Sequence, residues 1–545
     1  MKNSSTSIHR WAAFALALAC VGSHHAIAAS LVEPDARSFL AQASFGPTTE
    51  STAEVMAMGR TAWLQKQFVL PASDYKGFAF QDPHPSIGCP VGSVATCYRD
   101  HYSLFPLQVQ FFQNALVGQD QLRQRVALAL SEILVTSGQQ IRQPYAMANY
   151  QRIFLNHAFG NFRDVLHAVT LSPAMGNFLN MANNDKPNPA RGTTPNENYA
   201  REVLQLFSIG LWKLHADGTH QLDKAGSPIP TYDQNTIEGF AHVFTGWTYP
   251  PRTGVTSRFP NPVNFDGAMV GFEAHHDSGP KLLLNGVTQP AGKSQLADLE
   301  AAIDSIFNHP NVGPFIGRQL IQQLVTSNPS PAYIARVTAV FNGTNGAARG
   351  DMKAVITAVL TDPEAISPAA PSLFGKLREP ILQLTHLTRI LGGQSDGVWL
   401  RAQAANLGEP VFSPATVFNF FSPDYPLPDD PALDGPAFGV YNATTAFAYS
   451  AVVAGVLSAN GIAPDSSVPG STGTKIDLTR WQPFAANPQN LVNEINRVVL
   501  GGRMSAGLAN YLLSAIQTQP ASNPLGRVRA ALTLALNSSE YLVEH

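Results

Sequence analysis

Charge is the scarcest feature of this sequence. Asp, Glu, Lys and Arg make up 13% of the 545 residues, about half of the ~25% that is usual in soluble domains. The formal net charge is -3, and Lys and Arg form no block along the chain. We therefore expect neither nucleic acid nor an anionic membrane surface as a partner.

Cysteine is also scarce, with three residues in the whole chain. Cys89 and Cys97 flank a Gly-, Pro- and Ser-containing loop, CPVGSVATC. In an oxidising compartment such a pair predicts a disulfide. The alternative is a metal site with two thiolates, but it lacks further Cys or a close pair of His residues.

Long apolar runs are missing as well, so we expect no transmembrane segment. The run over residues 11–21 is shorter than the ~20 residues that span a bilayer. It follows Lys2 and Arg10 and precedes a small-x-small site at residues 26–28, which is typical of a signal peptide. We predict a signal peptide at residues 1–28, a mature chain from about Ala29, and a periplasmic or extracellular location. The alternative is a lipoprotein anchored at Cys20, whose preceding residues fit that pattern less well.

Several catalytic signatures are absent. The chain has no H-E-x-x-H, no G-x-S-x-G, no C-x-x-C-H and no dinucleotide fingerprint, and the passage from Gly286 to Ser294 has one residue too many for a phosphate loop. No haem, nucleotide or flavin is therefore expected. A divalent metal stays open, with its identity unknown.

The periodicity of the apolar residues predicts an all-α fold. Apolar side chains recur at three- and four-residue spacing in many segments, and no series of alternating strands is seen. We predict one large multi-helix domain over residues 29–545 with long ordered loops, either undivided or in two lobes, and an irregular insertion around residues 249–295. Short strands are expected at residues 269–272 and 281–284. Among the helices expected are those over residues 52–68, 120–135, 145–159, 314–325, 376–390 and 524–537.

Residues 196–248 carry the clearest pattern. Two amphipathic helices are expected to face each other across a polar loop, with apolar residues on one side of the first helix and Glu197, Asn198, Arg201 and Glu202 on the other. Asn196 can cap the first helix.

Several passages resemble the bacterial family of unknown function DUF1800. They are PNENYAREVLQLFSIG, the following Y-x-Q-x-x-x-E-x-x-A-x-x-x-TGWT, ASFGPT, SPAM, HDSGPK, TSNPSPAYIARV, RGDMKAVITAVLTDPEA, FGKLREP and SPATVFNFFSPDYP. The resemblance covers nearly the whole mature chain in order. It implies an exported protein, often encoded beside a second exported family, but no settled activity. At the position of His242 similar sequences commonly have Arg, so the resemblance gives this histidine no role.

Glu202 is the first candidate catalytic residue. It lies at the edge of the apolar stripe, where desolvation would raise its pKa toward the range useful for acid–base chemistry, and Arg201 and Asn198 could support it. The alternative is structural: Arg201 bridges carboxylates one turn away, a contribution of about 0.2–0.5 kcal/mol per pair. Glu238 and His242, one turn apart, could ligate a metal only with a third ligand, and we expect an ordinary salt bridge.

The densest polar cluster comprises His275, His276, Asp277 and Lys281. Imidazole with carboxylate is typical of acid–base or metal-ligand chemistry, while the alternative is a network that pins the loop, with Asp277 accepting from local backbone N–H groups. If this loop meets the first helix, Glu202, Glu238, His276 and Asp277 could form one site, and Arg378 could pair with a carboxylate there.

Two functions are compatible with these residues. The first is a hydrolase-like enzyme of carboxylate type that acts on an envelope or extracellular polymer such as a glycan, with Glu202, Asp277, His276, Arg201 and Arg378 as candidate catalytic residues. The aromatic run from Phe418 to Tyr425 could stack on a sugar ring, although core packing is its more common use. The second is a non-catalytic exported scaffold that works with a partner protein, in which the same side chains are buried ion pairs.

Overall fold

Helices form most of the molecule, as the periodicity predicts. The structure is a computed structural model that describes residues 31–545 except 83, 345 and 368–372. Within these residues it contains 24 α-helices and, as sheets, only pairs of short strands, which confirms the predicted all-α class. Nearly all of the buried apolar side chains belong to one continuous core, so the described chain forms a single large domain. The predicted signal peptide, including Cys20, lies outside the described residues.

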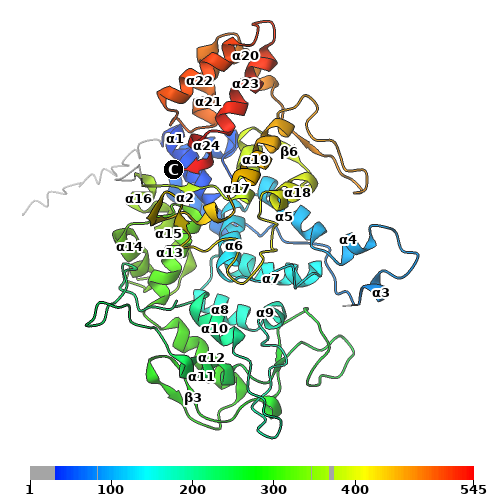
Figure 1. The fold of residues 1–545 in the computed structure, drawn as a ribbon, viewed down its shortest axis with the longest axis vertical. Helices are drawn as coiled ribbons and strands as arrows, with labels where there is room; N and C mark the ends of the chain where they lie inside the picture. Colours follow the sequence, from blue (N-terminus) through cyan, green and yellow to red (C-terminus); the bar gives the residue numbers. More distant parts are fainter. Residues whose placement is uncertain (1–30, 83, 345, 368–372) are drawn as a thin grey trace, which may run out of the picture.

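The middle of the molecule is built from N-terminal helices (Figure 1). Among these N-terminal helices α6 is the most buried, because eleven of its thirteen residues are buried, charged Arg125 and Glu132 among them. It packs against α2, α5, α7 and α13. The bounds are α1 (Glu33–Ala43), α2 (Thr49–Val69), α5 (Phe105–Val117), α6 (Gln121–Ile133) and α7 (Pro144–His157). α2 is kinked at Gly59, whose φ of 79° is left-handed, a conformation that glycine adopts without a steric penalty.

One end of the molecule holds the two predicted facing helices. α10 (Asn198–Gln205) packs against α11 (Gln234–Val243), and both lie with α12 at the lower end of Figure 1. The short strands expected in this region are present. The elements here are α8 (Phe162–Thr170), α9 (Pro173–Phe178), α12 (Gln295–Phe307), β1 (Trp247–Thr248) with β2 (Val270–Gly271), β3 (Lys281–Leu282) with β4 (Thr288–Gln289), η1 (Glu273–His275) and η2 (Leu284–Gly286).

Beside the middle helices lie α13 (Val312–Leu324), α14 (Pro331–Phe341), α15 (Met352–Thr361) and α16 (Pro363–Ile366). The helix predicted over residues 376–390 begins later than expected, at Pro380, as α17 (Pro380–Ile390). Lys376–Leu377 is instead strand β5, which pairs antiparallel with the C-terminal strand β10 (Val543–Glu544). The periodicity missed α18 (Val398–Asn406), and α19 (Ala443–Val456) follows it.

The opposite end from α10 is the C-terminal helical bundle at the top of Figure 1. It comprises α20 (Gln482–Ala485), α21 (Pro488–Val498), α22 (Ala506–Gln517) and α23 (Pro524–Leu536), and α24 (Ser539–Leu542) then returns the chain to α1. The remaining elements are the strand pairs β6 (Gln394–Ser395) with β9 (Thr474–Lys475) and β7 (Pro426–Leu427) with β8 (Asp430–Asp434), and the short helices η3 (Pro436–Gly439) and η4 (Thr479–Trp481).

The predicted disulfide is present between Cys89 and Cys97, whose Cα atoms are 5.9 Å apart. It joins the ends of two short helices that flank the loop between these cysteines, α3 (Pro85–Gly88) and α4 (Cys97–His101). In the described part of the chain no helix combines the length and the apolar character that crossing a bilayer requires.

Candidate functional site

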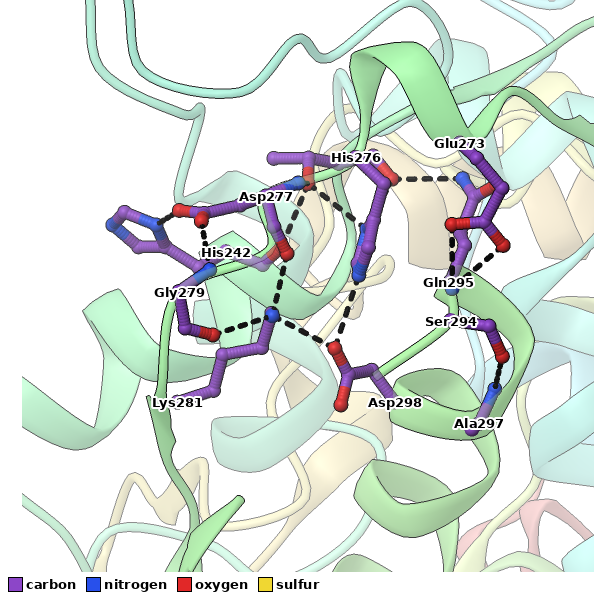
Figure 2. Close-up of polar contacts among 11 residues, drawn as sticks. His242, Glu273, His276, Asp277, Gly279, Lys281, Ser294, Gln295, Ala297 and Asp298 are labelled. Atoms are coloured by element: carbon purple, nitrogen blue, oxygen red, sulfur yellow. Dashed lines mark hydrogen bonds and ion pairs between the residues drawn. The ribbon is translucent and has the colours of Figure 1, made fainter. Parts of the chain in front are cut away.

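The His276 cluster forms a closed network (Figure 2). His276 Nε2 lies 3.0 Å from Asp298 Oδ2, and its Nδ1 lies 3.2 Å from the carbonyl oxygen of Thr245. The Lys281 ammonium group contacts Asp298 Oδ2 at 2.7 Å and donates to the carbonyl oxygens of Asp277 and Gly279 at 2.6 and 2.9 Å. An ammonium group has three N–H donors, so all three have acceptors. The polar atoms of the His276 and Lys281 side chains therefore all have partners, and of these three side chains only Asp298 has an oxygen, the buried Oδ1, that accepts no hydrogen bond within the described residues.

Asp277 also has local partners. One of its oxygens accepts from the backbone N–H of Gly279 at 2.7 Å, as the loop-pinning alternative expects, and the other contacts His242 of α11. Burial pushes the pKa of Asp277 up, but the bonds from Gly279 and His242 outweigh it and hold that pKa below its ordinary value. His275 lies outside this network, stacked on Phe259 and 3.1 Å from Asp185.

The residues predicted on α10 lie on the neighbouring element but make separate contacts. Arg201 pairs with Glu197 at 2.9 Å in a half-exposed i, i+4 bridge, and Asn198 donates to Asn180 at 2.8 Å. Glu238 contacts Gln234 of its own helix at 3.4 Å. Burial raises the pKa of Glu202 above its ordinary value, with Arg201 opposing the shift. α10 and the His276 loop thus both pack against α11, yet their polar groups form two networks.

Arg378 lies in a third region, away from both of these networks. Its guanidinium group lies 5.0 Å from the centre of the Tyr541 ring, donates to the carbonyl oxygen of Tyr541 and lies 3.7 Å from the Glu544 carboxylate. The side chain is buried, and it attaches the C-terminal strand to β5. It does not meet His276 or Glu202.

Glu379, the residue after Arg378, belongs to a cluster of glutamates that the sequence did not predict. Glu132, Glu379 and Glu409 each place a carboxylate oxygen within 4.8 Å of the other two, and they are 8%, 1% and 0% exposed. Both oxygens of Glu132 and Oε1 of each of the other two accept no hydrogen bond within the described residues. Like charges at such distances raise the free energy of the folded state unless protons or a cation neutralise them.

Helix ends hold the three glutamates in place. Glu132 is in the last turn of α6, and Glu379 is the N-cap residue of α17. Glu409 follows α18 through Gly408, whose φ of 93° turns the chain after the helix. Because Pro380 has no N–H, the first free donor of α17 is Ile381, and it donates to Glu409 Oε2 at 2.8 Å. The positive N-terminal end of α17 therefore stabilises this carboxylate.

Two buried cations accompany the cluster. Lys376 donates to the carbonyl oxygen of Gln323 at 2.5 Å, and Arg125 donates to the same oxygen. Gln323 lies in the last turn of α13, where the carbonyl groups lack partners within the helix. Burial lowers the pKa of Lys376, and the negative charge of Glu379 opposes this. Burial raises the pKa values of Glu132 and Glu409 well above the ordinary value, and the charge of Glu379 raises both further.

A cavity of about 320 Å³ opens onto this cluster. Glu132, Glu379 and Lys376 line it, whereas Glu409 is not among its lining residues. Its wall also contains aromatic and amide side chains, and two of the aromatic ones, Trp212 and Phe418, are 39% and 53% exposed. The cavity therefore combines a charged interior with an accessible aromatic rim, which is the composition of a ligand site.

Residues 38–543 match the family described as "Protein of unknown function (DUF1800)". The chain belongs to the DUF1800 family. Comparisons with curated proteins and with solved structures find no match.

Four of the DUF1800-like passages meet at this cavity although they are far apart in sequence. The first facing helix supplies Gln205, FGKLREP supplies Lys376 and Glu379, SPATVFNFFSPDYP supplies Phe418, and TSNPSPAYIARV supplies Ser327. Sequence reasoning singled out Arg378 in FGKLREP, one residue from the glutamate that faces the cavity. It did not single out Glu132 or Glu409, each an isolated carboxylate without a local motif.

Proposed function

We propose that this chain is an exported hydrolase whose catalytic centre is the glutamate cluster at the cavity. The observation that carries the proposal is the set of buried, unpartnered carboxylate oxygens of Glu132 and Glu379 that line a solvent-reachable space. If the role of these carboxylates were purely structural, their unpartnered oxygens would only destabilise the fold, because each buried polar group without a hydrogen bond costs about 1–3 kcal/mol. Strongly perturbed carboxyl groups in a cleft are typical of functional sites.

The arrangement is suited to the activation of water. A carboxylate at the cavity floor can accept a proton while the water oxygen bonds to an electrophilic carbon or phosphorus of the substrate. The bond from that atom to the leaving oxygen then breaks, and the leaving oxygen takes a proton from a protonated carboxyl or from solvent. Glu379 suits the first task, because it lines the cavity and its Oε1 accepts no hydrogen bond within the described residues.

A glycan or another polyhydroxylated polymer fits the rest of the cavity. Trp212 and Phe418 present exposed ring surface at its rim, and aromatic rings combine apolar faces with defined geometry. Amide groups of Gln205, Gln319 and Asn419 also line the wall and can both donate to and accept from hydroxyl groups. The rim therefore offers both contacts that a sugar ring needs.

Export is part of the proposal. The N-terminal sequence has the basic, apolar and small-residue order of a signal peptide, and the Cys89–Cys97 disulfide suits an oxidising space. Expression of the full-length chain followed by cell fractionation and N-terminal sequencing tests this. We expect the mature protein outside the cytoplasm with its N-terminus near Ala29.

The activity test uses purified mature protein with cell-wall and extracellular polysaccharides, and measures the new reducing ends. We expect Glu379→Gln to lower the rate by about 10²–10⁴-fold, the range for loss of a general acid or base, while thermal stability is kept. The matched control is Glu300→Gln, which removes one carboxylate from a surface pair with Arg163 and should leave the rate unchanged.

A rate that is equal in the parent and in Glu379→Gln would contradict the proposed centre. If no polymer is cleaved and a single envelope protein co-purifies in stoichiometric amount, the chain acts instead as the non-catalytic exported partner.

A further inference from the structure

The spacing of the three glutamates matches the coordination shell of a single ion. Two oxygens bound to the same cation can be separated by at most twice the metal–oxygen distance, which gives about 4–5 Å for Mg²⁺ or Ca²⁺. One oxygen each from Glu132, Glu379 and Glu409 lies within 4.8 Å of the others. At this upper limit of separation the point equidistant from the three oxygens is about 2.8 Å from each, slightly longer than a Ca²⁺–oxygen bond, so a small movement of the side chains brings all three carboxylates to one ion.

The hydrogen bonding around the cluster also leaves its carboxylate oxygens available to a positive group. Four carboxylate oxygens of these residues are buried and accept no hydrogen bond within the described chain. The two neighbouring cations do not fill this role, because Lys376 and Arg125 direct N–H groups to the carbonyl oxygen of Gln323. They offset part of the negative charge from a distance and leave the carboxylate oxygens free to coordinate.

We propose that Glu132, Glu379 and Glu409 bind one divalent cation of the oxygen-preferring class, Mg²⁺, Ca²⁺ or Mn²⁺. The ligand set contains oxygen alone, without the thiolate or imidazole groups that favour zinc or copper. The proposal deepens the proposed function and rests on it for the role of the ion in catalysis, but the binding itself does not depend on any substrate.

The position of the ligands relative to the cavity gives the ion an open side. Glu132 and Glu379 line the cavity, whereas Glu409 does not line it. The helix N-terminus that donates Ile381 N–H to Glu409 Oε2 fixes this third ligand. An ion held in this way presents its remaining coordination positions to the cavity, where it can bind water and lower the pKa of that water.

The test measures ion binding by the purified mature protein after treatment with a chelator and desalting. MnCl2 is titrated with electron paramagnetic resonance detection of free Mn²⁺, and MgCl2 and CaCl2 are then used as competitors. We expect one site per chain with a dissociation constant no weaker than about 10⁻³ M, the weak limit of extracellular calcium modules. The same ions should raise the melting temperature in proportion to the logarithm of their concentration above that constant.

Three isosteric variants, Glu132→Gln, Glu379→Gln and Glu409→Gln, each remove one ligand charge. We expect each to weaken Mn²⁺ binding at least about 10–100-fold, the loss found even for residues that merely orient metal ligands. In the chelator each variant should be at least as thermostable as the parent, because the substitution relieves repulsion among the carboxylates. Glu300→Gln serves again as the control and should bind Mn²⁺ as the parent does.

Absence of saturable binding of all three ions by the parent protein would overturn the proposal, whatever the variants do. Parent binding that persists unchanged in Glu379→Gln and Glu409→Gln would overturn it too, because the ion would then lie elsewhere. If no ion binds but Glu379→Gln still abolishes polymer hydrolysis, the proposed function is supported and the proposed cation site is wrong. If the ion binds and no polymer is cleaved, the site stands and the hydrolase is wrong.

Discussion

Replacing Asp298 with Asn removes the carboxylate that the buried Lys281 ammonium group contacts at 2.7 Å. The two side chains are 1% and 0% exposed, so water cannot replace the lost partner. Breaking a buried ion pair from one side costs about 3–5 kcal/mol, because an uncompensated charge remains in the interior. Lys281 keeps its bonds to the carbonyl oxygens of Asp277 and Gly279, so we expect a loss near the lower end of this range.

The loss can be converted into a change in melting temperature. Unfolding entropy is about 2.1 cal/mol/K per residue, which gives roughly 1.1 kcal/mol/K for a chain of this length and a decrease of about 3–5 °C in melting temperature. Differential scanning calorimetry of the mature protein measures it. The control is Arg201→Gln, which removes the half-exposed pair with Glu197, worth about 0.2–0.5 kcal/mol or less than about 1 °C.

A second variant separates the lost charge from lost packing. In Asp298→Asn combined with Lys281→Met the uncompensated ammonium group is absent, so the double variant should be more stable than Asp298→Asn alone. If Asp298→Asn lowers the melting temperature no more than Arg201→Gln does, the network in Figure 2 is not a buried ion pair and the structural role assigned to His276 and Lys281 is refuted.

Three further outcomes follow from single residues. Burial, with the charges of Lys213 and Arg349, lowers the pKa of His309 to about 4 from an ordinary 6.5. As the pH falls, the histidine of the unfolded chain is therefore protonated before that of the folded chain, and the free energy of unfolding should decrease by roughly 3 kcal/mol between pH 6.5 and pH 4. His309→Asn should flatten that part of a curve of stability against pH. Cys89→Ser should make residues 85–101 sensitive to limited proteolysis, since closing so short a loop is worth about 2–3 kcal/mol. Glu202→Gln should change the melting temperature by less than about 1 °C, because Oε2 of Glu202 is buried without a hydrogen-bond partner; a decrease of several degrees would show that this carboxylate is part of a buried ion pair.

Local periodicity predicted the helices whose burial is one-sided. Residues 524–537 were expected as a helix and form α23 (Pro524–Leu536), with Val528, Ala531, Leu532 and Ala535 buried at helical spacing. α18 was missed because only Leu400 and Ala404 of its nine residues are buried, so it shows no apolar stripe. A helix that contacts the core through two residues leaves almost no periodic signal.

The error at residues 376–390 has a different cause. Lys376 and Leu377 pair with residues at the far end of the chain, Glu544 and Val543, and such a remote partner leaves no local pattern. The start of α17 at Pro380 can be predicted from the sequence, because proline is favoured at the first position of a helix. Here tertiary pairing determined the structure of the preceding residues.

The candidate site residues show a similar limit of prediction from sequence. α10 and the His276 loop both contact α11, but their polar groups form two networks. The high local density of polar residues around His276 and Asp277 in the sequence does not show whether their side chains face a cavity or one another. Glu132 and Glu379 are about 250 residues apart in the sequence, so only the tertiary fold brings the end of α6 close to the start of α17.

The location of charge in this charge-poor chain favours the glutamate cluster over the His276 network as the reactive centre. In the His276 network each charged group has an oppositely charged or hydrogen-bonding partner at 2.6–3.0 Å, which lowers the free energy of the fold. In the glutamate cluster the carboxylates face one another, while the cations bind the end of α13. Such an arrangement destabilises the folded protein unless protons or a bound cation neutralise the carboxylates. A contribution to folding stability therefore explains the His276 network, whereas the glutamate cluster is better explained by a function.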